Sequence, residues 1–479
     1  MPDSGKTLFW YDLETTGIDS IRDRPLQFAG IRTDESLNEI GDPLNFLCQP
    51  GDDVVPSPDA LLVTGIRMSD IADHGLIERD FAALIMGEFS QADTCVVGFN
   101  SIRFDDEFVR QMFYRNFHDP YAREWRGGNS RWDVIDLFRM AYALRPEGLS
   151  WPEREPGIPS FRLEDLAHAN GLAHENAHDA LADVRTTIEM TRRVRQAQPK
   201  LYDYLFRLRE KKAVLQQLYP LGKQAVVHVS SMYPARRGCT AVVLPLCQHP
   251  TNNNGIICFD LSAAPDGLLE ANAEELSRLV FSRADELDAG EDRIPLKTIH
   301  INRAPAVAPL GTLTLAAASR LQIDLAACEA HRLALQHQAG LVEKIQDAFA
   351  AVVFPEREDP DDLLYGGPFF ADSDRNVMTE VVASDPGKLA GFAGRFQDDR
   401  LDEMLFRYRA RNWPGQLTPA EVERWNAFRR ERWEQGALLV AAEARRRELL
   451  AEPSLSADDR AVLDDLGDYL GALQAGIGQ

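Results

Sequence analysis

The sequence lacks long apolar runs and has few cysteines. No stretch of about 18 consecutive apolar residues occurs, so we expect no membrane-spanning helix. The N-terminal segment MPDSGKTLFW has neither a basic region nor a long apolar region, which argues against a signal peptide. Only six cysteines occur, none of them in a C-x-x-C pair. That pattern is typical of reduced thiols in a cytoplasmic protein and favours neither a zinc site nor a disulfide framework.

Positive charge is also scarce. The chain has 52 Lys and Arg against 75 Asp and Glu, a formal net charge of -23. Binding to nucleic-acid phosphates is driven largely by Lys and Arg, so this deficit argues against tight, indiscriminate binding to duplex DNA. A local basic groove remains compatible with an acidic whole. With 479 residues, 44% of them hydrophobic, the chain can bury a large core and is expected to form two to four domains.

The order of apolar patterns predicts three domains. Residues 1–198 alternate strand-like segments (TLFWYDLE, PLQFAGIRTD, LNFLCQP, TCVVGFN) with helix-like segments (DEFVRQMFYRNF, RWDVIDLFRMAYAL, SFRLEDLAHANGL, DALADVRTTIEMTRRVRQ), which predicts an α/β domain. In residues 199–352 the β-branched segments AVVHVSSMY, CTAVVLPLCQHP, GIICFDL and KTIHINRAPAV predict a β-rich domain. After the charged segment FPEREDPDD, residues 356–479 are predicted to be helical, with PAEVERWNAFRRERWEQGALLVAAEARRRELLA as the longest helical segment.

Two acidic residues interrupt the apolar run FWYDLETTG near the N-terminus. Side chains alternate along a strand, so Asp12 and Glu14 would project from the same face and repel each other. A divalent cation removes this conflict, because carboxylates, water and phosphate are the oxygen ligands that Mg²⁺ prefers. The alternative is that the strand has already ended and that both acids lie in a solvated turn with Thr15, Thr16 and Gly17.

A second acidic group follows the strand-like segment TCVVGFN. Asp105, Asp106 and Glu107 would begin a helix there, where the helix macrodipole by itself favours acidic residues. The position therefore predicts the start of a helix and leaves open which of the three acids has a chemical role.

A third group of candidate site residues lies in the segment HENAHDALADVRTT, which contains His174, His178, Asp179 and Asp183. His178 and Asp183 are five residues apart, about 140° of rotation on an ideal helix, so they converge only if His178 precedes the regular helix. Asp179 competes, because Asp179 and Asp183 share a helix face at a spacing of four. The alternative is a surface helix with a capping aspartate and an idle histidine.

Taken together, D-x-E, a later aspartate and H-x-x-x-x-D resemble the active-site pattern of the DEDD exonucleases in their histidine-containing branch. GFNSIRFDDEF, NSRWDVIDLFRMAYALRPEG, NAHDALADV, LYGGPFFADSDR and LFRYRARNWPG extend the resemblance, to the exodeoxyribonuclease I family of proteobacteria, over nearly the whole chain. The resemblance implies a ribonuclease H-like exonuclease domain, an SH3-like β domain and a helical C-terminal domain that enclose a single-strand channel in a monomer. Its spacing selects Asp105 over Asp106, and His178 with Asp183 over Asp179.

The resemblance also implies a reaction, the processive 3′-to-5′ hydrolysis of single-stranded DNA to 5′-mononucleotides, in DNA repair and recombination. Two Mg²⁺ ions, for which Mn²⁺ can substitute, would activate a water and clamp the attacking and leaving oxygens. Asp12 is expected to bridge the ions, Glu14 and Asp183 to complete the first metal site, and Asp105 to support the second through water. His178 is expected to be the general base, a role that suits its near-neutral pKa.

A basic groove with aromatic platforms is the usual way to hold a single strand, and arginine supplies both charge and stacking. Residues 101–170 contain ten Arg and twelve Asp or Glu, so many of these arginines must form salt bridges. By resemblance, Glu14, Thr15, Gly17 and Asn100 are expected at the terminal nucleotide. The alternatives are that Asn100 orders the Asp105 loop and that Thr15 and Gly17 form an ordinary strand-to-loop turn. Arg162 is expected at the scissile phosphate; the alternative is a surface arginine paired with Glu164 or Asp165. The remaining expected DNA contacts are Arg110, Tyr121, Trp125, Arg139, Lys211, Lys212, Asn254, Lys297, His300 and Asn302.

The resemblance further implies that the acidic, apolar C-terminal tail of single-stranded-DNA-binding protein docks on the chain. A terminal carboxylate needs an Arg or Lys partner beside an apolar floor, and Arg145 and Tyr204 are the candidates; the alternative for both is interdomain packing. Two other functions remain open. An RNA-trimming or proofreading exonuclease would use the same acidic residues but needs only the first domain. A non-catalytic scaffold that binds single strands would not need the full acidic set.

Overall fold

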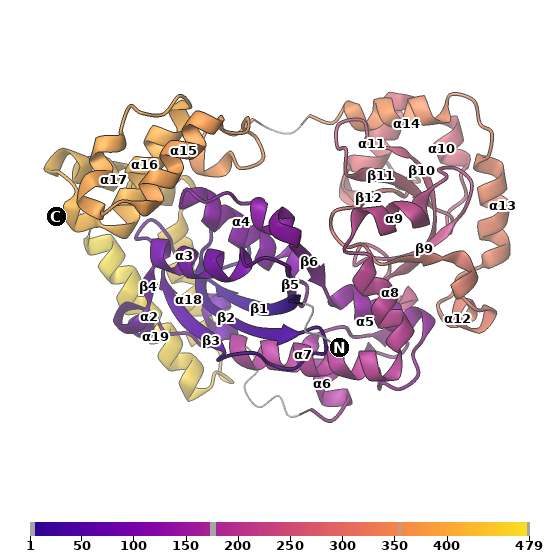
Figure 1. Cartoon of the computed structure of the whole chain (residues 1–479), viewed down its shortest axis with the longest axis horizontal. Coiled ribbons are helices and arrows are strands. Elements are labelled where there is room, and N and C mark those ends of the chain that lie inside the picture. The colour runs from indigo at the N-terminus through magenta and orange to yellow at the C-terminus, as the bar shows by residue number, and fades with distance from the viewer. Residues whose placement is uncertain (1–4, 173–178, 354–355, 477–479) are drawn as a thin grey trace. The chain divides into compact units, whose positions relative to one another are not determined.

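The structure is a computed structural model that describes residues 5–172, 179–353 and 356–476 (Figure 1). The chain forms two compact units. The first unit comprises residues 1–130, 175–185 and 356–479, and the second comprises 131–174 and 186–355. In the described ranges no helix combines the length and the apolar character needed to cross a membrane. All six cysteines are buried free thiols.

A mixed β-sheet forms the base of the first unit, with strand order β4-β3-β2-β1-β5. Central strand β1 pairs antiparallel with β2 and parallel with β5, and β2 pairs antiparallel with β3. The bounds are β1 (Thr7–Thr15), β2 (Pro25–Asp34), β3 (Leu44–Gln49), β4 (Leu76–Ile77) and β5 (Thr94–Gly98). The four strands predicted from apolar runs in this region are confirmed.

Alternation along β1 sends its aromatic and acidic side chains to opposite faces of the sheet. Phe9, Tyr11 and Leu13 belong to a core cluster that includes Phe89 of α3 (Glu78–Phe89) and Val109 of α4 (Asp105–Arg115). Both helices lie along one face of the sheet (Figure 1). The Tyr11 and Phe89 rings meet edge to face, with centroids 5.0 Å apart. The aromatic core therefore fixes β1 from one face and leaves the acids of β1 on the other.

Helices make up the C-terminal part of the first unit, as predicted. They are α15 (Asp372–Ala383), α16 (Asp399–Asn412), α17 (Pro419–Gln435), α18 (Leu438–Leu450) and α19 (Ala457–Ala475). Helix α19 packs on α1 (Pro58–Thr64) and α2 (Met68–His74) through an apolar cluster that includes Leu61, Ile71 and Leu466. The helical segment predicted from Pro419 onward is two helices, because α17 ends at Gln435, with Gly436 as its C-cap, and Ala437 adopts a left-handed conformation.

The second unit contains a five-stranded antiparallel sheet in the order β12-β11-β10-β9-β13. Its strands are β9 (Val226–Val229), β10 (Thr240–Gln248), β11 (Gly255–Asp260), β12 (Leu296–His300) and β13 (Val307–Pro309). The β-branched segments of the sequence are thus confirmed as strands. Helices of this unit are α5 (Ile135–Leu144), α6 (Leu163–Ala169), α8 (Pro199–Arg207), α9 (Lys211–Leu218), α10 (Asp266–Glu270), α11 (Ala273–Phe281), α12 (Leu315–Arg320), α13 (Leu325–Leu335) and α14 (Leu341–Ala350).

One predicted helix begins later than expected. RWDVIDLFRMAYAL was assigned to a helix throughout, but Ser130–Asp133 form β6, which carries the chain from the first unit to the second. Trp132 packs edge to face on Tyr202, with ring centroids 5.4 Å apart, and the Asp133 carboxylate accepts a hydrogen bond from the backbone N–H of Ile135 at 3.1 Å. Tertiary packing thus overrides the local helical pattern for the three residues 131–133.

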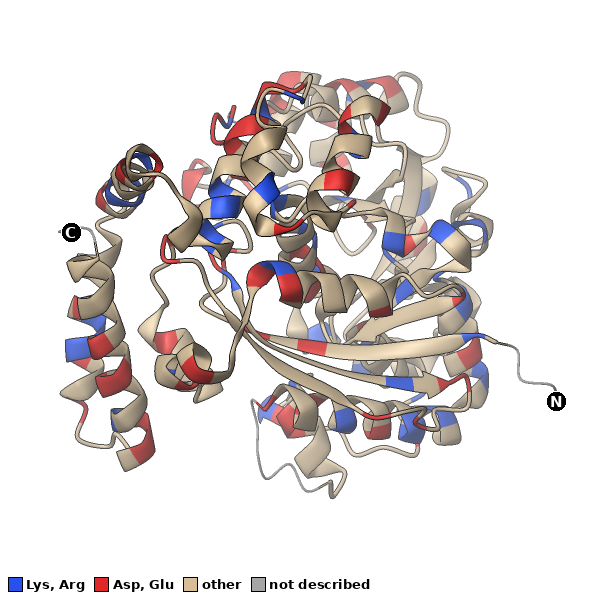
Figure 2. Ribbon diagram, turned by 60° about the vertical axis from the view of Figure 1, so that its left-hand side comes forward, with Lys and Arg blue, Asp and Glu red and all other residues tan. Residues whose placement is uncertain are grey.

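A buried ionic cluster joins α16 to the rest of the first unit. Arg411 donates to Asp53 at 2.9 Å and to Asp361 at 2.6 Å, and Arg407 donates to Asp361 at 3.0 Å. Burial acts to raise the pKa of Asp361, but Arg411 and Arg407 outweigh it and hold the pKa well below its usual value. Acidic and basic residues are interspersed along the helices generally (Figure 2). Much of the basic charge is therefore compensated within the fold.

We predict that Asp361→Asn lowers the free energy of unfolding at pH 7 by about 3–5 kcal/mol, because it leaves buried arginines without their carboxylate. The folded-state pKa of Asp361 lies below its unfolded value of about 4, so its contribution is present above that pH and is lost as the pH falls further. The difference between variant and wild type should therefore shrink below about pH 4. Urea unfolding followed by circular dichroism measures both effects.

The control is Asp385→Asn, which removes an exposed carboxylate paired with Lys388. It should leave the unfolding midpoint unchanged. An Asp361→Asn protein as stable as the wild type at pH 7 would contradict the prediction.

Candidate active site

Three carboxylates converge where β1 meets the start of α7 (Ala180–Ala197). Oxygens of Asp12, Glu14 and Asp183 all lie within 4.8 Å of one another. Asp12 and Glu14 share a face of β1, and Asp183 lies in the first turn of α7. Because β1 extends through Thr15 and only 8% of Glu14 is exposed, the alternative of two acids in a solvated turn is wrong.

Without a positive charge nearby, ionising all three carboxylates of this cluster is energetically unfavourable. Burial raises the pKa of Glu14 to about 9, with Asp12 and Asp183 adding to the shift. Burial likewise raises the pKa of Asp12 well above its usual value, with further contributions from Asp105 and Asp183. A divalent cation would relieve the repulsion. The donor set consists of carboxylate oxygens, which fit a hard cation such as Mg²⁺ or Mn²⁺ rather than a metal that prefers sulfur.

Asp105 is the first residue of α4 and is buried. It lies near enough to raise the pKa of Asp12 but is not one of the three carboxylates within 4.8 Å. Asn100, at the entry to this helix, has a left-handed backbone (φ 62°), which asparagine tolerates better than most residues. The site thus has a tight triad and a fourth acid beside it, supplied by a separate element.

The segment after Glu14 is held closely. The Thr15 hydroxyl donates to the Gly17 carbonyl at 2.7 Å, and the Thr16 hydroxyl donates to Asp23 at 3.0 Å. A Cβ atom at Gly17 would lie 2.4 Å from an Asp23 carboxylate oxygen, so a larger residue would displace that side chain. The absence of a side chain at Gly17 therefore permits a tight turn beside the carboxylates.

The histidine predicted as general base, His178, lies outside the described residues, as does His174. Helix α7 begins at Ala180, two residues after His178. Asp179, the competing candidate, is described and contributes to the raised pKa of Glu14, after burial, Asp12 and Asp183. The role of His178 stays a prediction.

Two of the expected DNA contacts in the first unit lie together. The Arg110 guanidinium lies 5.6 Å from the centre of the Tyr121 ring and donates to both oxygens of Glu124, at 2.8 and 3.0 Å. Its charge is therefore already compensated. Trp125 is 64% exposed and has the Arg126 guanidinium 5.6 Å from its ring centre. The base contacts of Tyr121 and Trp125 stay predictions, and Arg110 holds the segment through its bonds to Glu124.

Sequence reasoning missed two aromatic residues beside Tyr121. The rings of Tyr365 and Phe369 have centroids 6.5 and 6.4 Å from that of Tyr121, and 83% of Phe369 is exposed. The sequence signal that could have identified Tyr365 and Phe369 is the segment LYGGPFFADSDR. Its glycines and proline argue against a helix, so its three aromatic residues are not accounted for by a helical core face. The contact between Tyr365 and Tyr121 joins residues some 245 positions apart, and local periodicity does not predict contacts of that separation.

Arginines expected to contact DNA in the second unit have acidic partners. Arg162 is 70% exposed and lies 2.7 Å from Glu164, which is the arrangement considered as the alternative. Arg139 is buried and lies 2.8 Å from Asp136. Each guanidinium would have to share or leave its carboxylate to bind a phosphate. Their DNA contacts stay predictions.

The remaining expected contacts of the second unit lie on or after β12, before β11 and at the start of α9. Lys297 and His300 are three residues apart on β12, so they project from opposite faces. The Lys297 ammonium bonds the Ser230 hydroxyl, and burial lowers the pKa of His300 to about 4. The carbonyls of Asn254 and Asn302 accept hydrogen bonds from Ile301 and Arg131, and Lys211 and Lys212 begin α9.

Three family models match the chain in succession. A model described as Exonuclease matches residues 9–191, one described as Exonuclease I SH3-like domain matches residues 209–351, and one described as Exonuclease I C-terminal domain matches residues 358–473. The expected fold class is confirmed, with an α/β exonuclease domain followed by an SH3-like domain and a helical C-terminal domain.

Relatives match over nearly the full length. Exodeoxyribonuclease I of Haemophilus influenzae is 42% identical over 465 residues, which is 97% of this chain and 98% of that protein. The crystal structure of Escherichia coli exonuclease I with a dA16 oligonucleotide matches with a TM-score of 0.93 at 40% identity, covering 98% of this chain and 100% of the other. A zinc-bound E. coli exonuclease I complex with single-stranded DNA also matches with a TM-score of 0.93 and 40% identity, covering 98% and 99%.

We predict that Asp183→Asn weakens the binding of Mn²⁺ to EDTA-treated protein by at least about tenfold. Removing a residue that only hydrogen-bonds a metal ligand already lowers metal affinity by about this factor, so removing a ligand should cost no less. Isothermal titration calorimetry without DNA measures the affinity. The control is Asp70→Asn, which removes an exposed acid in the first turn of α2. Equal affinities in both variants would contradict the assignment of Asp183 to the metal cluster.

Proposed function

This chain belongs to the exodeoxyribonuclease I family, and we propose that it degrades single-stranded DNA processively from the 3′ end to 5′-mononucleotides, in DNA repair and recombination. The single observation that carries the proposal is the cluster of Asp12, Glu14 and Asp183 in a chain that matches all three family models. The relatives with bound oligonucleotide support single-stranded DNA as the substrate.

In this proposal two Mg²⁺ ions bind at the carboxylates. Asp12, Glu14 and Asp183 would hold the first ion, and Asp12 and Asp105 would hold the second. When bound, the ions supply charge stabilisation at phosphorus and favour ionisation of the attacking water. His178 accepts the proton of that water, and the close turn at Thr15 to Gly17 allows the 3′-terminal nucleotide to approach β1.

Substrate binding relies on stacking more than on charge. Tyr121, Trp125, Tyr365 and Phe369 form what we call the aromatic surface of the first unit. Stacking of a base on an aromatic side chain contributes about 1–3 kcal/mol and tolerates any sequence. Because Arg110 is paired with Glu124, a surface of this kind suits a protein with a net charge of -23. The contacts proposed from the second unit are Asn254, Lys297, His300, Asn302, Lys211, Arg139 and Arg162.

The proposed domains are residues 1–198, 199–352 and 356–479, with the last closing a channel around the DNA. In the first unit, Arg411 of the helical region pairs with Asp53 of the α/β region. Deleting residues 356–479 would therefore remove the hydrogen-bonded cation of buried Asp53 and leave Arg24, at 4.0 Å, as its remaining ion-pair partner among the described residues. Point substitutions are the better test of function, since the truncated protein is expected to lose stability.

We predict that the protein with Mg²⁺ releases 5′-mononucleotides from single-stranded DNA labelled at either end, with RNA and duplex DNA as comparison substrates. Asp183→Ala should abolish the activity, and His178→Ala should lower kcat by about 10²–10⁴-fold through loss of the general base. Gel and chromatographic analysis of the products measures the polarity. Faster loss of RNA would favour the RNA-trimming alternative, and no loss of any substrate would favour the scaffold.

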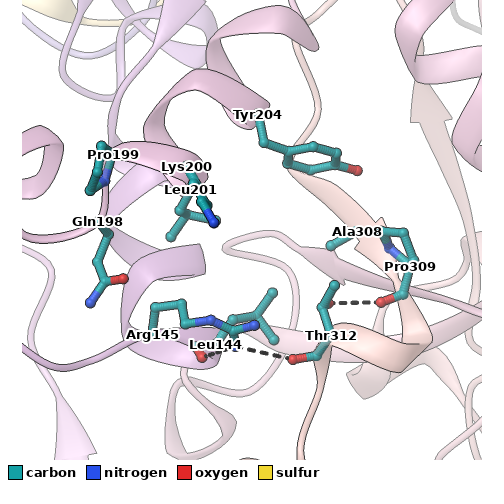
Figure 3. Close-up of a pocket in the computed structure, with 10 residues that line it drawn as sticks. All are labelled: Leu144, Arg145, Gln198, Pro199, Lys200, Leu201, Tyr204, Ala308, Pro309 and Thr312. Carbon is teal, nitrogen blue, oxygen red and sulfur yellow. Dashed lines mark hydrogen bonds between the residues drawn. The ribbon is translucent and has the colours of Figure 1, made fainter.

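A cavity in the second unit suits the proposed partner, the acidic, apolar tail of single-stranded-DNA-binding protein. The cavity has a volume of about 560 Å³ and contains both predicted partner residues, Arg145 and Tyr204 (Figure 3). Arg145 and Lys200 supply positive charge, and the apolar lining comes from Leu144, Pro199, Leu201, Ala308 and Pro309. Charge beside an apolar floor is the combination that a terminal carboxylate with apolar neighbours requires.

The hydrogen bonds of this cavity hold its two recognition residues in place. The Arg145 guanidinium donates to the backbone carbonyls of Leu144 and Thr312, and the Tyr204 hydroxyl donates to the Val307 carbonyl at 2.9 Å. Among the described residues, no carboxylate forms an ion pair with Arg145. Neutral acceptors therefore orient the Arg145 guanidinium without compensating its charge. This arrangement favours the binding of a carboxylate over the alternative that Arg145 serves interdomain packing alone.

We predict that Arg145→Ala lowers the affinity for a fluorescent peptide of the last residues of single-stranded-DNA-binding protein about tenfold, the effect of losing a charged hydrogen bond. Fluorescence anisotropy measures it. Arg283→Ala, which removes an exposed arginine outside the cavity, is the control. Equal binding of the free and the amidated peptide would contradict carboxylate recognition.

A further inference from the structure

Two adjacent aspartates begin α4, and their surroundings differ. Asp105 lies near Asp12 of the carboxylate cluster. Asp106 is 1% exposed, and one of its oxygens accepts hydrogen bonds from the Tyr11 hydroxyl at 2.8 Å and from the Arg123 guanidinium at 2.6 Å. A buried carboxylate with two such donors stabilises the geometry of its neighbours.

Tyr11 connects this aspartate to the strand that carries the metal ligands. It precedes Asp12 on β1, and its ring packs between Phe28 and Phe89 in the aromatic core. The Tyr11 hydroxyl donates to Asp106, which links β1 directly to the first turn of α4.

Arg123 connects the same aspartate to the aromatic surface. It is buried, with its guanidinium 4.9 Å from the centre of the Phe89 ring, and its Nε and Nη1 atoms have no hydrogen-bond partner. Within the described part of the chain, Asp106 is its one hydrogen-bond acceptor. Arg123 belongs to the short helix Ala122–Glu124, between Tyr121 and Trp125.

A second ion pair reinforces this link. Glu124, the next residue, accepts two hydrogen bonds from Arg110, one turn further along α4. The first two turns of α4 thus hold the segment from Tyr121 to Trp125 through Asp106 and Arg110. The same turns carry Asp105 toward Asp12.

We propose that Asp106 is a positioning residue that ligates no metal but, through Tyr11 and Arg123, holds the first turn of α4 so that Asp105 serves the metal site. The same contacts tie the segment with Tyr121 and Trp125 to that turn. Metal affinity and affinity for single-stranded DNA are then coupled through α4. The inference rests on the proposed function for the role of Asp105.

The first test is Tyr11→Phe, which keeps the ring in the core and removes the hydroxyl bonded to Asp106. Loss of this hydrogen bond is expected to weaken Mn²⁺ binding by about 3–10-fold in calorimetry without DNA. The Mg²⁺ concentration for half-maximal rate should rise by the same factor. Saturating Mg²⁺ should restore kcat to within about twofold of the wild type, whereas a general loss of folding would not be rescued in this way.

Tyr114→Phe is the matched control. Tyr114 lies further along α4, is buried, and donates one hydrogen bond to the Pro360 carbonyl at 3.0 Å. Tyr114→Phe loses the same chemical group as Tyr11→Phe, a buried hydroxyl that forms a hydrogen bond, and should keep wild-type metal affinity. An equal change in both variants would show a general effect of destabilising α4 and would overturn the proposal.

The second test removes the ion pair without leaving a buried charge, by combining Asp106→Asn with Arg123→Met. This double variant should bind Mn²⁺ several-fold more weakly. It should also bind fluorescent oligo-dT more weakly in EDTA, by anisotropy, because the segment with Tyr121 and Trp125 loses its anchor. Wild-type affinities for Mn²⁺ and DNA in both Tyr11→Phe and the double variant would overturn the proposal, even if all proteins degrade DNA. A wild-type protein that binds metal but degrades nothing would instead refute the proposed function.

Discussion

The mutual repulsion of Asp12, Glu14 and Asp183 is the constraint on which the first unit depends. Two charges at the observed limit of 4.8 Å repel by about 3 kcal/mol at an effective dielectric constant of 20. Fully burying one large apolar side chain stabilises a fold by about 1.5–3 kcal/mol, so several are needed to hold such a cluster. The aromatic residues on the opposite face of β1, together with strand pairing on both sides, meet this requirement and keep β1 in place whether or not a cation is bound.

Buried ion pairs between arginines and acidic residues are the second feature that holds the structure together. Arg110, Arg123 and Arg411 are each buried and each bonded to carboxylates. Such pairs contribute little net stability compared with apolar packing, but removing one partner is costly. They therefore act as rigid connections between segments far apart in the chain. An aromatic surface of the kind proposed for DNA binding fits a single strand with exposed bases better than a duplex.

Sequence reasoning found the elements and missed the contacts between them. Apolar runs identified β1 and the strands beside it, and the D-x-E spacing placed Asp12 and Glu14 on one face, because both depend on residues close in the chain. Strand β6 was missed because the packing of Trp132 on Tyr202 decides it. The residues of the aromatic surface beyond Trp125 were missed for the same reason. The segment HENAHDALADVRTT made His178 a candidate, and the family resemblance selected it. The residue pair Arg145 and Tyr204 came from the resemblance alone.

The aspartates that begin α4 show why composition at a helix start does not determine function. The macrodipole favours both equally. Each residue of a helix turns about 100° from the previous one, so Asp105 and Asp106 face different neighbours. A shift of α4 by one residue would turn Asp106 toward the metal cluster and leave Arg123 buried without its carboxylate. The register of α4 is therefore constrained from both sides, by the carboxylates of β1 and by a buried arginine. The left-handed backbone at Asn100 and the short helix Ser101–Arg103 that set this register have a role in the site although they contribute none of its carboxylates.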